Sequence, residues 1–164
     1  MIRSTIYWVG TGTRGRLGIL ARPRAGDWLE DEMKALRDAG VEILVSLLTP
    51  EEETELELEA EKKWCESAAM KFLSFPIDDR GTPDSDREAL ASINGLESAG
   101  SDGKTVAVHC RMGIGRSSLI AASVMVRLGI DGNVAFERLA ASRGLAVPDT
   151  EEQRRWVLQL KRRG

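Results

Sequence analysis

The sequence predicts an α/β fold in which a central, mostly parallel and twisted sheet has helices on both faces. Short apolar segments alternate along the chain with longer amphipathic ones, as strands and helices do in such folds. The segment 43–48 is almost continuously apolar, which is typical of a central strand covered on both sides. The 164 residues, 42% of them hydrophobic, suffice for one domain with its own core and leave no room for a second. We therefore expect residues 1–164 to form a single domain.

Five segments have the β-branched and aromatic residues that are typical of strands. They are residues 2–9, 17–23, 41–48, 71–75 and 104–108. Between the first two, residues 10–15 match the G-x-G-x-x-G pattern of dinucleotide-binding loops. Because a second strand follows instead of the helix that such a loop requires, we interpret these glycines as a turn.

Six helices are expected from capping residues and from the spacing of apolar positions. They cover residues 28–39, 49–67, 84–98, 117–128, 134–142 and 150–162. Asp27 is expected to cap the first, and a turn is expected at 99–103. The helix at 117–128 is apolar on most sides and should be the central buried one. In the next helix, Val134 is among the residues expected to face inward.

The predicted helix at 49–67 carries a run of glutamates. They occupy positions 51, 52, 53, 55, 57, 59 and 61. Their spacing favours a solvated side, paired with the two lysines that follow, while Leu56, Ala60 and Trp64 face inward. The alternative is an acidic surface that binds a partner.

Composition excludes several classes of function. The net charge of −3 argues against nucleic acid as a main partner, because that binding depends on basic patches. No segment reaches the ~18 apolar residues of a membrane span, and the N-terminus lacks the order of regions found in signal peptides. We expect a cytoplasmic protein, for which a monomer is compatible with the sequence.

The cysteines and the histidine narrow the chemistry further. Cys65 and Cys110 are the only cysteines, and a reducing compartment keeps both as thiols. No motif surrounds Cys65, which we interpret as a packed thiol, with a redox partnership with Cys110 as the alternative. His109 is the only histidine, so a site with several histidine ligands is excluded. We expect no metal and no cofactor.

The segment 109–117 reads H-C-R-M-G-I-G-R-S and joins an apolar strand to the start of a helix. Such a junction directs several backbone N–H groups and the positive end of a helix dipole at one point. A dianion such as phosphate can bind there. Gly113 and Gly115 allow the backbone to curve around the ion.

Three side chains of this segment can act on a bound phosphate. Cys110 lies at the mouth of the loop, where the helix dipole and a nearby guanidinium favour its nucleophilic thiolate form. The planar guanidinium of Arg116 can hold two phosphate oxygens at once. Ser117 can place a hydroxyl near the sulfur and stabilise the thiolate when it leaves.

A second polar loop follows the strand at 71–75. Residues 76–84 read P-I-D-D-R-G-T-P-D, and their glycine and prolines suit a loop. Cleavage of a phosphate ester requires protonation of the leaving oxygen, and a carboxylic acid held over the phosphate can supply that proton. Asp78 and Asp79 are the candidates.

The string at 109–117 resembles the signature of the cysteine-dependent protein tyrosine and dual-specificity phosphatases. This resemblance implies that Cys110 is the nucleophile, that Arg116 binds phosphate, and that Ser117 supplies the hydroxyl. It also implies a structural role for His109, which orients the loop through hydrogen bonds. The remaining loop residues then bind the substrate phosphate, and these are Arg111, Met112, Gly113, Ile114 and Gly115.

Two further segments resemble this family. Residues 76–84 resemble the general-acid loop P-x-x-D-x-G-x-P of the kinase-associated kind of dual-specificity phosphatase, which implies that Asp79 is the acid and leaves Asp78 as the rival. The stretch that begins at Gln153 resembles the start of the last helix of small phosphatases, where a glutamine helps to place water. A surface glutamine without a role is the alternative.

The resemblance implies a metal-independent phosphatase that acts through a phosphocysteine on phosphorylated proteins or peptides. Phosphotyrosine is the expected substrate, with phosphoserine and phosphothreonine if the pocket is shallow. Arg111 is one extra cation in the loop, which favours protein substrates over highly charged phosphoinositide head groups. A phosphoinositide or other non-protein phosphatase is the first alternative, and a non-catalytic phosphate-recognition module is the second. The spacing from Cys110 to Arg116 and the acid loop disfavour a sulfurtransferase.

Overall fold

The computed structural model describes residues 4–160, which form a five-stranded sheet with the order β1-β2-β5-β3-β4. The strands are β1 (Tyr7–Val9), β2 (Leu17–Ala21), β3 (Ile43–Ser46), β4 (Lys71–Ser74) and β5 (Val106–Cys110). Only the edge pair β1 and β2 is antiparallel, and the other pairs are parallel. The predicted mostly parallel sheet is therefore confirmed.

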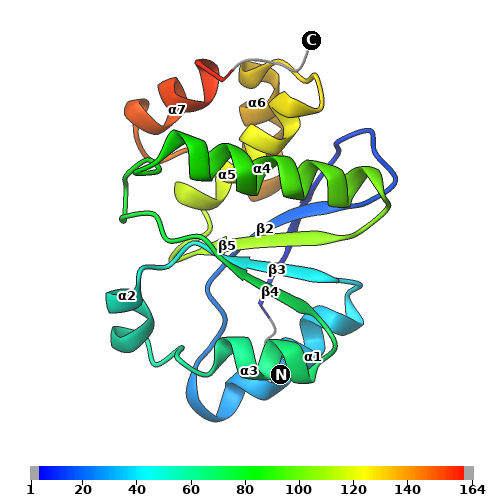
Figure 1. The fold of residues 1–164 in the computed structure, drawn as a ribbon, viewed down its shortest axis with the longest axis vertical. Coiled ribbons are helices and arrows are strands. Elements are labelled where there is room, and N and C mark those ends of the chain that lie inside the picture. The colour runs from blue at the N-terminus through cyan, green and yellow to red at the C-terminus, as the bar shows by residue number, and fades with distance from the viewer. Residues whose placement is uncertain (1–3, 161–164) are drawn as a thin grey trace.

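Helices cover both faces of the sheet (Figure 1). They are α1 (Leu29–Asp38), α2 (Pro50–Glu55), α3 (Glu61–Ser67), α4 (Asp86–Ser101), α5 (Arg116–Arg127), α6 (Gly132–Arg143) and α7 (Glu151–Leu158). One layer holds α1 and α3, and the other holds α4 to α7, while α2 lies beyond the carboxyl ends of the strands (Figure 1). None of the helices within residues 4–160 has the length and apolarity needed to span a bilayer.

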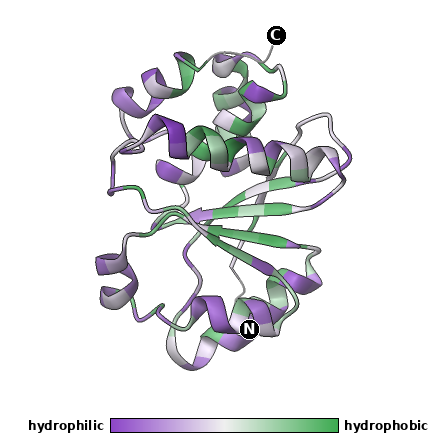
Figure 2. Ribbon diagram, viewed as in Figure 1, coloured by the Kyte–Doolittle hydropathy of each residue, from purple (hydrophilic) through white to green (hydrophobic). Residues whose placement is uncertain are grey.

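Two hydrophobic clusters occupy the two sides of the sheet, whose strands form the apolar centre of the molecule (Figure 2). Neighbouring residues of a strand point to opposite faces, so Leu44 joins the cluster beside α1 and α3 while Val45 joins the other. The helix α5 is buried along eleven of its twelve residues, which confirms the prediction of a central helix. The strand that feeds the segment 109–117 is thus held rigidly on both faces.

The long helix predicted over 49–67 is wrong, because the chain breaks it into α2 and α3. Glu57 adopts a left-handed φ of 57°, and the N–H of Leu58 bonds back to the Glu53 carbonyl at 2.8 Å. This turn buries Leu58 in the core. Ala60, which was expected to face inward, is exposed.

Three smaller expectations are also wrong. Asp27 does not cap α1 but lies in a short 3-10 helix, Gly26–Trp28, that precedes it. The helix α4 continues through most of the turn expected at 99–103 and ends at Ser101, where the Asp102 N–H still donates to the Ser98 carbonyl at 3.0 Å. Val134 is exposed and Ala135 is buried instead. The predicted residues 2, 3, 161 and 162 lie outside the described part of the chain.

Candidate active site

The loop of residues 111–115 lies where β5 ends and α5 begins, at the carboxyl edge of the sheet. It packs tightly on β2, because the Arg22 N–H donates to the Arg111 carbonyl at 3.3 Å. Gly113 has a φ of 70°, and a Cβ at this position would lie 2.6 Å from the backbone N of Ala21. This position therefore requires glycine for both its conformation and its close approach.

Cys110 and Ser117 face each other at the start of α5. The Cys110 Sγ lies 3.4 Å from the Ser117 Oγ, and both side chains are buried. Gly115 caps α5, so the sulfur lies near the positive end of a twelve-residue helix. The arrangement can hold a thiolate and can supply a hydrogen-bond donor to it.

The guanidinium of Arg116 is fixed by hydrogen bonds to the Glu52 carboxylate and to the Ile77 carbonyl. Its Nη1 and Nη2 donate to the two carboxylate oxygens of Glu52 at 2.6 and 2.9 Å, and Nη1 also donates to the Ile77 carbonyl at 2.9 Å. Burial opposes the charge of Arg116, but Glu52 outweighs it and raises the Arg116 pKa. A buried, permanently charged fork at the edge of the loop is suited to phosphate.

Glu52 was expected on the solvated side of its helix, and that interpretation is wrong. It is buried, and it completes a capping box in which the Glu52 N–H donates to the Thr49 hydroxyl and the Thr49 N–H donates to Oε1 of Glu52. Burial alone would raise the Glu52 pKa, but hydrogen bonds from Arg116 and Thr49 and the Arg116 charge hold it below its usual value. The T-x-x-E pattern of Thr49 and Glu52 was the sequence signal that could have distinguished Glu52 from the solvated glutamates.

Glu61 is a second glutamate whose expected solvation is wrong. Its Oε2 lies 2.5 Å from Nε2 of His109, and both side chains are almost fully buried. Burial alone would lower the His109 pKa, but the charge and hydrogen bond of Glu61 outweigh it and raise that pKa. His109 Nδ1 also lies 3.3 Å from the Cys110 carbonyl. The pair therefore anchors the strand residue that precedes Cys110.

The loop of residues 76–84, called the acid loop below, brings Asp79 next to Arg116. Its Oδ1 lies 3.2 Å from Nη2 of Arg116, and its side chain is 57% exposed. The Asp78 carbonyl accepts the Gly81 N–H at 2.8 Å within the loop. No ion pair between Asp78 and Arg116 is found in residues 4–160. Asp79 is thus accessible to solvent and adjacent to the Arg116 guanidinium.

Gln153 supports the acid loop from α7. Its Oε1 accepts the N–H groups of Asp149 and Thr150 at 3.1 and 3.2 Å, and its Nε2 donates to the Gly81 carbonyl at 3.0 Å. The side chain is fully buried, and a Cβ on Gly115 would lie 3.0 Å from its Oε1. Gln153 therefore connects the two loops of the site.

The remaining cation of the loop is already paired. Arg111 donates to the Glu55 carboxylate at 3.0 and 3.4 Å and lies 3.8 Å from Glu52. Met112 is 59% exposed on the outer side of the loop, and Ile114 is half-buried. Arg111 therefore connects α2 to the loop.

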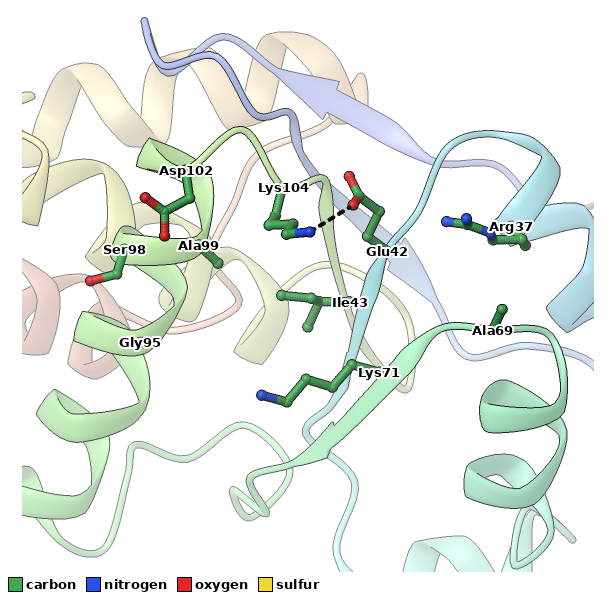
Figure 3. Close-up of a pocket in the computed structure, with 10 residues that line it drawn as sticks. All are labelled: Arg37, Glu42, Ile43, Ala69, Lys71, Gly95, Ser98, Ala99, Asp102 and Lys104. Atoms are coloured by element: carbon green, nitrogen blue, oxygen red, sulfur yellow. Dashed lines mark ion pairs between the residues drawn. The ribbon is translucent and has the colours of Figure 1, made fainter.

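A cavity of about 540 Å³ lies elsewhere in the molecule (Figure 3). Its lining includes Glu42 and Lys71, just before β3 and at the start of β4, and Lys104, which pairs with Glu42 at 3.5 Å. Cys110 ends β5, which runs parallel to β3. The cavity thus lies at the opposite edge of the sheet from the candidate active site.

Cys65 is also remote from the chemistry. It belongs to the cluster beside α1 and α3, whereas Cys110 belongs to the cluster on the other side of the sheet, and both are free thiols. Burial, followed by the charges of Glu61 and Glu66, raises the Cys65 pKa to about 12. This environment fits the packed, unreactive thiol that the sequence predicts.

The site combines a cysteine at the end of a central parallel strand, an arginine at the first position of the helix that follows the loop, and a second loop that brings a carboxylate to this arginine. This combination defines the protein tyrosine and dual-specificity phosphatase class. Residues 18–130 match the family described as the DSP-PTPase phosphatase of polymorphic toxin systems. The match spans more than half of the chain, which therefore belongs to this family. No curated protein matches the sequence.

Solved structures of this class have the same fold. Kinase associated phosphatase is 20% identical with a TM-score of 0.87, and the match covers 96% of this chain and 93% of that one. A putative protein tyrosine phosphatase from Leishmania major is 21% identical with a TM-score of 0.76, covering 98% and 100%. PTPMT1 in complex with PI(5)P is 18% identical with a TM-score of 0.71, covering 93% of each chain.

Proposed function

We propose that this phosphatase hydrolyses phosphate monoesters in two steps through a phosphocysteine. In the first step, the Cys110 thiolate attacks phosphorus, an S–P bond forms, the P–O bond to the leaving group breaks, and Asp79 gives its proton to the leaving oxygen. In the second step, Asp79 takes a proton from water as the water attacks phosphorus. The S–P bond then breaks, and inorganic phosphate and the Cys110 thiolate are released, with Ser117 donating a hydrogen bond to the sulfur.

Arg116 binds the transferring phosphoryl group in both steps. The equatorial oxygens carry the developing charge, and a fixed guanidinium with the loop N–H groups stabilises that charge without reorganising. Glu52 maintains the guanidinium plane through its two hydrogen bonds. The observation that carries the proposal is the 3.2 Å contact between Asp79 and Arg116, which brings acid and phosphate site together beside the nucleophile.

The substrates we propose are phosphorylated proteins or peptides. A phosphoinositide head group carries further phosphates and needs further cations near the loop. Arg111 is the extra cation of the loop, and Glu55 and Glu52 already neutralise it. A phosphoinositide is the alternative, supported by the likeness to PTPMT1 bound to PI(5)P. Because the reaction needs a reduced Cys110, we place the protein in a reducing compartment such as the cytoplasm.

The test is hydrolysis of a small aryl phosphate with a chelator present. We expect no turnover with Cys110→Ser and a loss of about 10²–10⁴ with Asp79→Ala, the usual size of a lost general acid. Asp78→Ala is the matched control, because it removes the neighbouring carboxylate of the same turn and should retain most activity. A native protein that binds phosphopeptides without releasing phosphate would instead be a recognition module.

A further inference from the structure

Arg143, the last residue of α6, contacts the outer side of the loop of residues 111–115. Its Nε donates to the Gly113 carbonyl at 3.1 Å, and its Nη2 donates to the Met112 carbonyl at 3.2 Å. Two adjacent carbonyls of the loop are therefore held by one planar guanidinium. Neither the sequence motif nor the proposed reaction uses this residue.

The two hydrogen bonds fix where the neighbouring N–H groups point. In a trans peptide the N–H is directed opposite to the carbonyl of the same unit. Holding the carbonyls of Met112 and Gly113 therefore directs the N–H groups of Gly113 and Ile114 away from Arg143. No protein acceptor for these two N–H groups is found within residues 4–160. They remain available for an anion.

The orientation of these two peptide planes depends on Arg143. Gly113 has a φ of 70° and no Cβ, so its own conformational preference does not select one orientation of the flanking peptide planes. Rotation of either plane would replace an N–H donor by a carbonyl dipole that repels phosphate. A fixed fork with two parallel donors opposes that rotation better than a single ammonium group does.

Arg143 itself is held on the far side by β1. Its guanidinium stacks over the Tyr7 ring at 4.4 Å from the centroid. The preceding residue, Ser142, donates its hydroxyl hydrogen bond to the Trp8 carbonyl at 2.6 Å. The guanidinium is thus positioned before any ligand arrives, as a preorganised support must be.

We propose that Arg143 is a positioning residue that keeps the Met112 and Gly113 peptide units in the orientation that binds phosphate. The inference rests on the proposed function of this loop as the phosphate site. Arg143 acts through the backbone and does not touch the substrate. It therefore affects the binding of every phosphate monoester, and of inorganic phosphate itself, to the same degree.

The test compares Arg143→Met, Arg143→Lys and Arg138→Met in the full chain. Arg138 is the control, because it lies on the same helix and donates to the Gly10 carbonyl at 3.2 Å, away from the loop. Calorimetry with inorganic phosphate and steady-state hydrolysis of an aryl phosphate are the readouts, and thermal unfolding verifies that each variant is folded. We expect Arg143→Met to weaken phosphate binding about tenfold, the effect of losing a charged hydrogen bond.

The pattern across the variants identifies the role. Arg143→Lys should recover part of the loss, since it keeps the charge and one donor, while Arg138→Met should bind phosphate like the native protein. The inference would be overturned if Arg143→Met bound inorganic phosphate as tightly as the native protein, or if Arg138→Met lost as much affinity as Arg143→Met. In either case, hydrolysis by the native protein would leave the proposed function intact. If the native protein binds phosphate without hydrolysis and only the Arg143 variants bind it more weakly, the proposed function fails and this inference holds.

Discussion

Replacing Glu52 with glutamine tests how Arg116, the proposed phosphate-binding residue, is held. The Glu52 carboxylate accepts two charged hydrogen bonds from Arg116 and one from the Thr49 N–H at 3.1 Å. Breaking a buried ion pair costs about 3–5 kcal/mol of folding free energy. The amide of glutamine retains one good acceptor, so we expect Glu52→Gln to lose about 3 kcal/mol, the lower end of that range. Hydrolysis should fall by up to about 10²-fold, because the guanidinium loses its fixed position.

The pH dependence of this loss has a definite sign. Arg116 and Thr49 hold the folded-state pKa of Glu52 below its usual value of 4.5. The pair therefore stabilises the native protein fully above the unfolded pKa, and the contribution is lost as the pH falls through the folded pKa. The difference in unfolding free energy between native protein and Glu52→Gln should be largest at neutral pH and should shrink in acid.

Urea unfolding at pH 7 and below measures both effects. Glu51→Gln is the matched control, since Glu51 is an exposed residue of the same first helical turn, and the ion pairs of Arg116 found in residues 4–160 are with Glu52 and Asp79. Removing its charge costs only the helix-dipole contribution of about 0.3–1 kcal/mol. Equal urea midpoints for the two variants at neutral pH would refute the view that Glu52 anchors the site.

Three more predictions follow from the contacts of the site. Glu61→Gln should lower the free energy of unfolding by about 3 kcal/mol, as for other broken buried pairs. Because the folded-state pKa of His109 is raised, the difference in unfolding free energy between native protein and variant should be fully present below pH ~6.5 and should decline as the pH rises through that folded pKa. Urea titrations at several pH values measure this difference. Gln153→Ala should lower kcat about tenfold, the effect of losing one supporting hydrogen bond, with little change in inorganic phosphate affinity, because the residue holds the acid loop rather than the phosphate; unchanged kcat contradicts this. Iodoacetamide at pH 7 should label Cys110 and leave Cys65 unlabelled until the protein is denatured, as peptide mass mapping can verify.

The positions of the two loops of the candidate site, residues 76–84 and 111–115, were predictable because each is a contiguous string with a local pattern. The residues that hold them in place were not. Glu52 contacts Arg116 across 64 positions of sequence, and Glu61 contacts His109 across 48. Within the acidic run both glutamates have the spacing of a solvated helix face. Only the N3 position of the capping box, three residues after Thr49, distinguished Glu52 from its neighbours.

The break in the predicted long helix had no clear signal either. Glu57 takes a left-handed conformation that is typical of glycine or asparagine, and tertiary packing of Leu58 compensates for it. The boundaries of β2 to β5 and of α5 were closer to expectation, because the apolar pattern that predicts them also produces their burial. The strand predicted over 2–9 was too long, since β1 begins only at Tyr7 and residues 4–6 are not part of it. Sequence patterns thus indicate elements that are stabilised by their own composition, and miss those stabilised by distant partners.

Because α2 is short, whether residues 50–55 stay helical is linked to whether an anion is bound at the candidate active site. Six residues are too few to remain helical in water, so α2 depends on its contacts, and its ion pairs join it to Arg116 and Arg111. Local opening of α2 therefore releases both guanidinium groups from their carboxylates. Conversely, an anion that fixes Arg116 stabilises the closed segment through the same side chain. The affinity for phosphate and the free energy of local opening of residues 50–55 are consequently linked, so a change in one is expected to change the other.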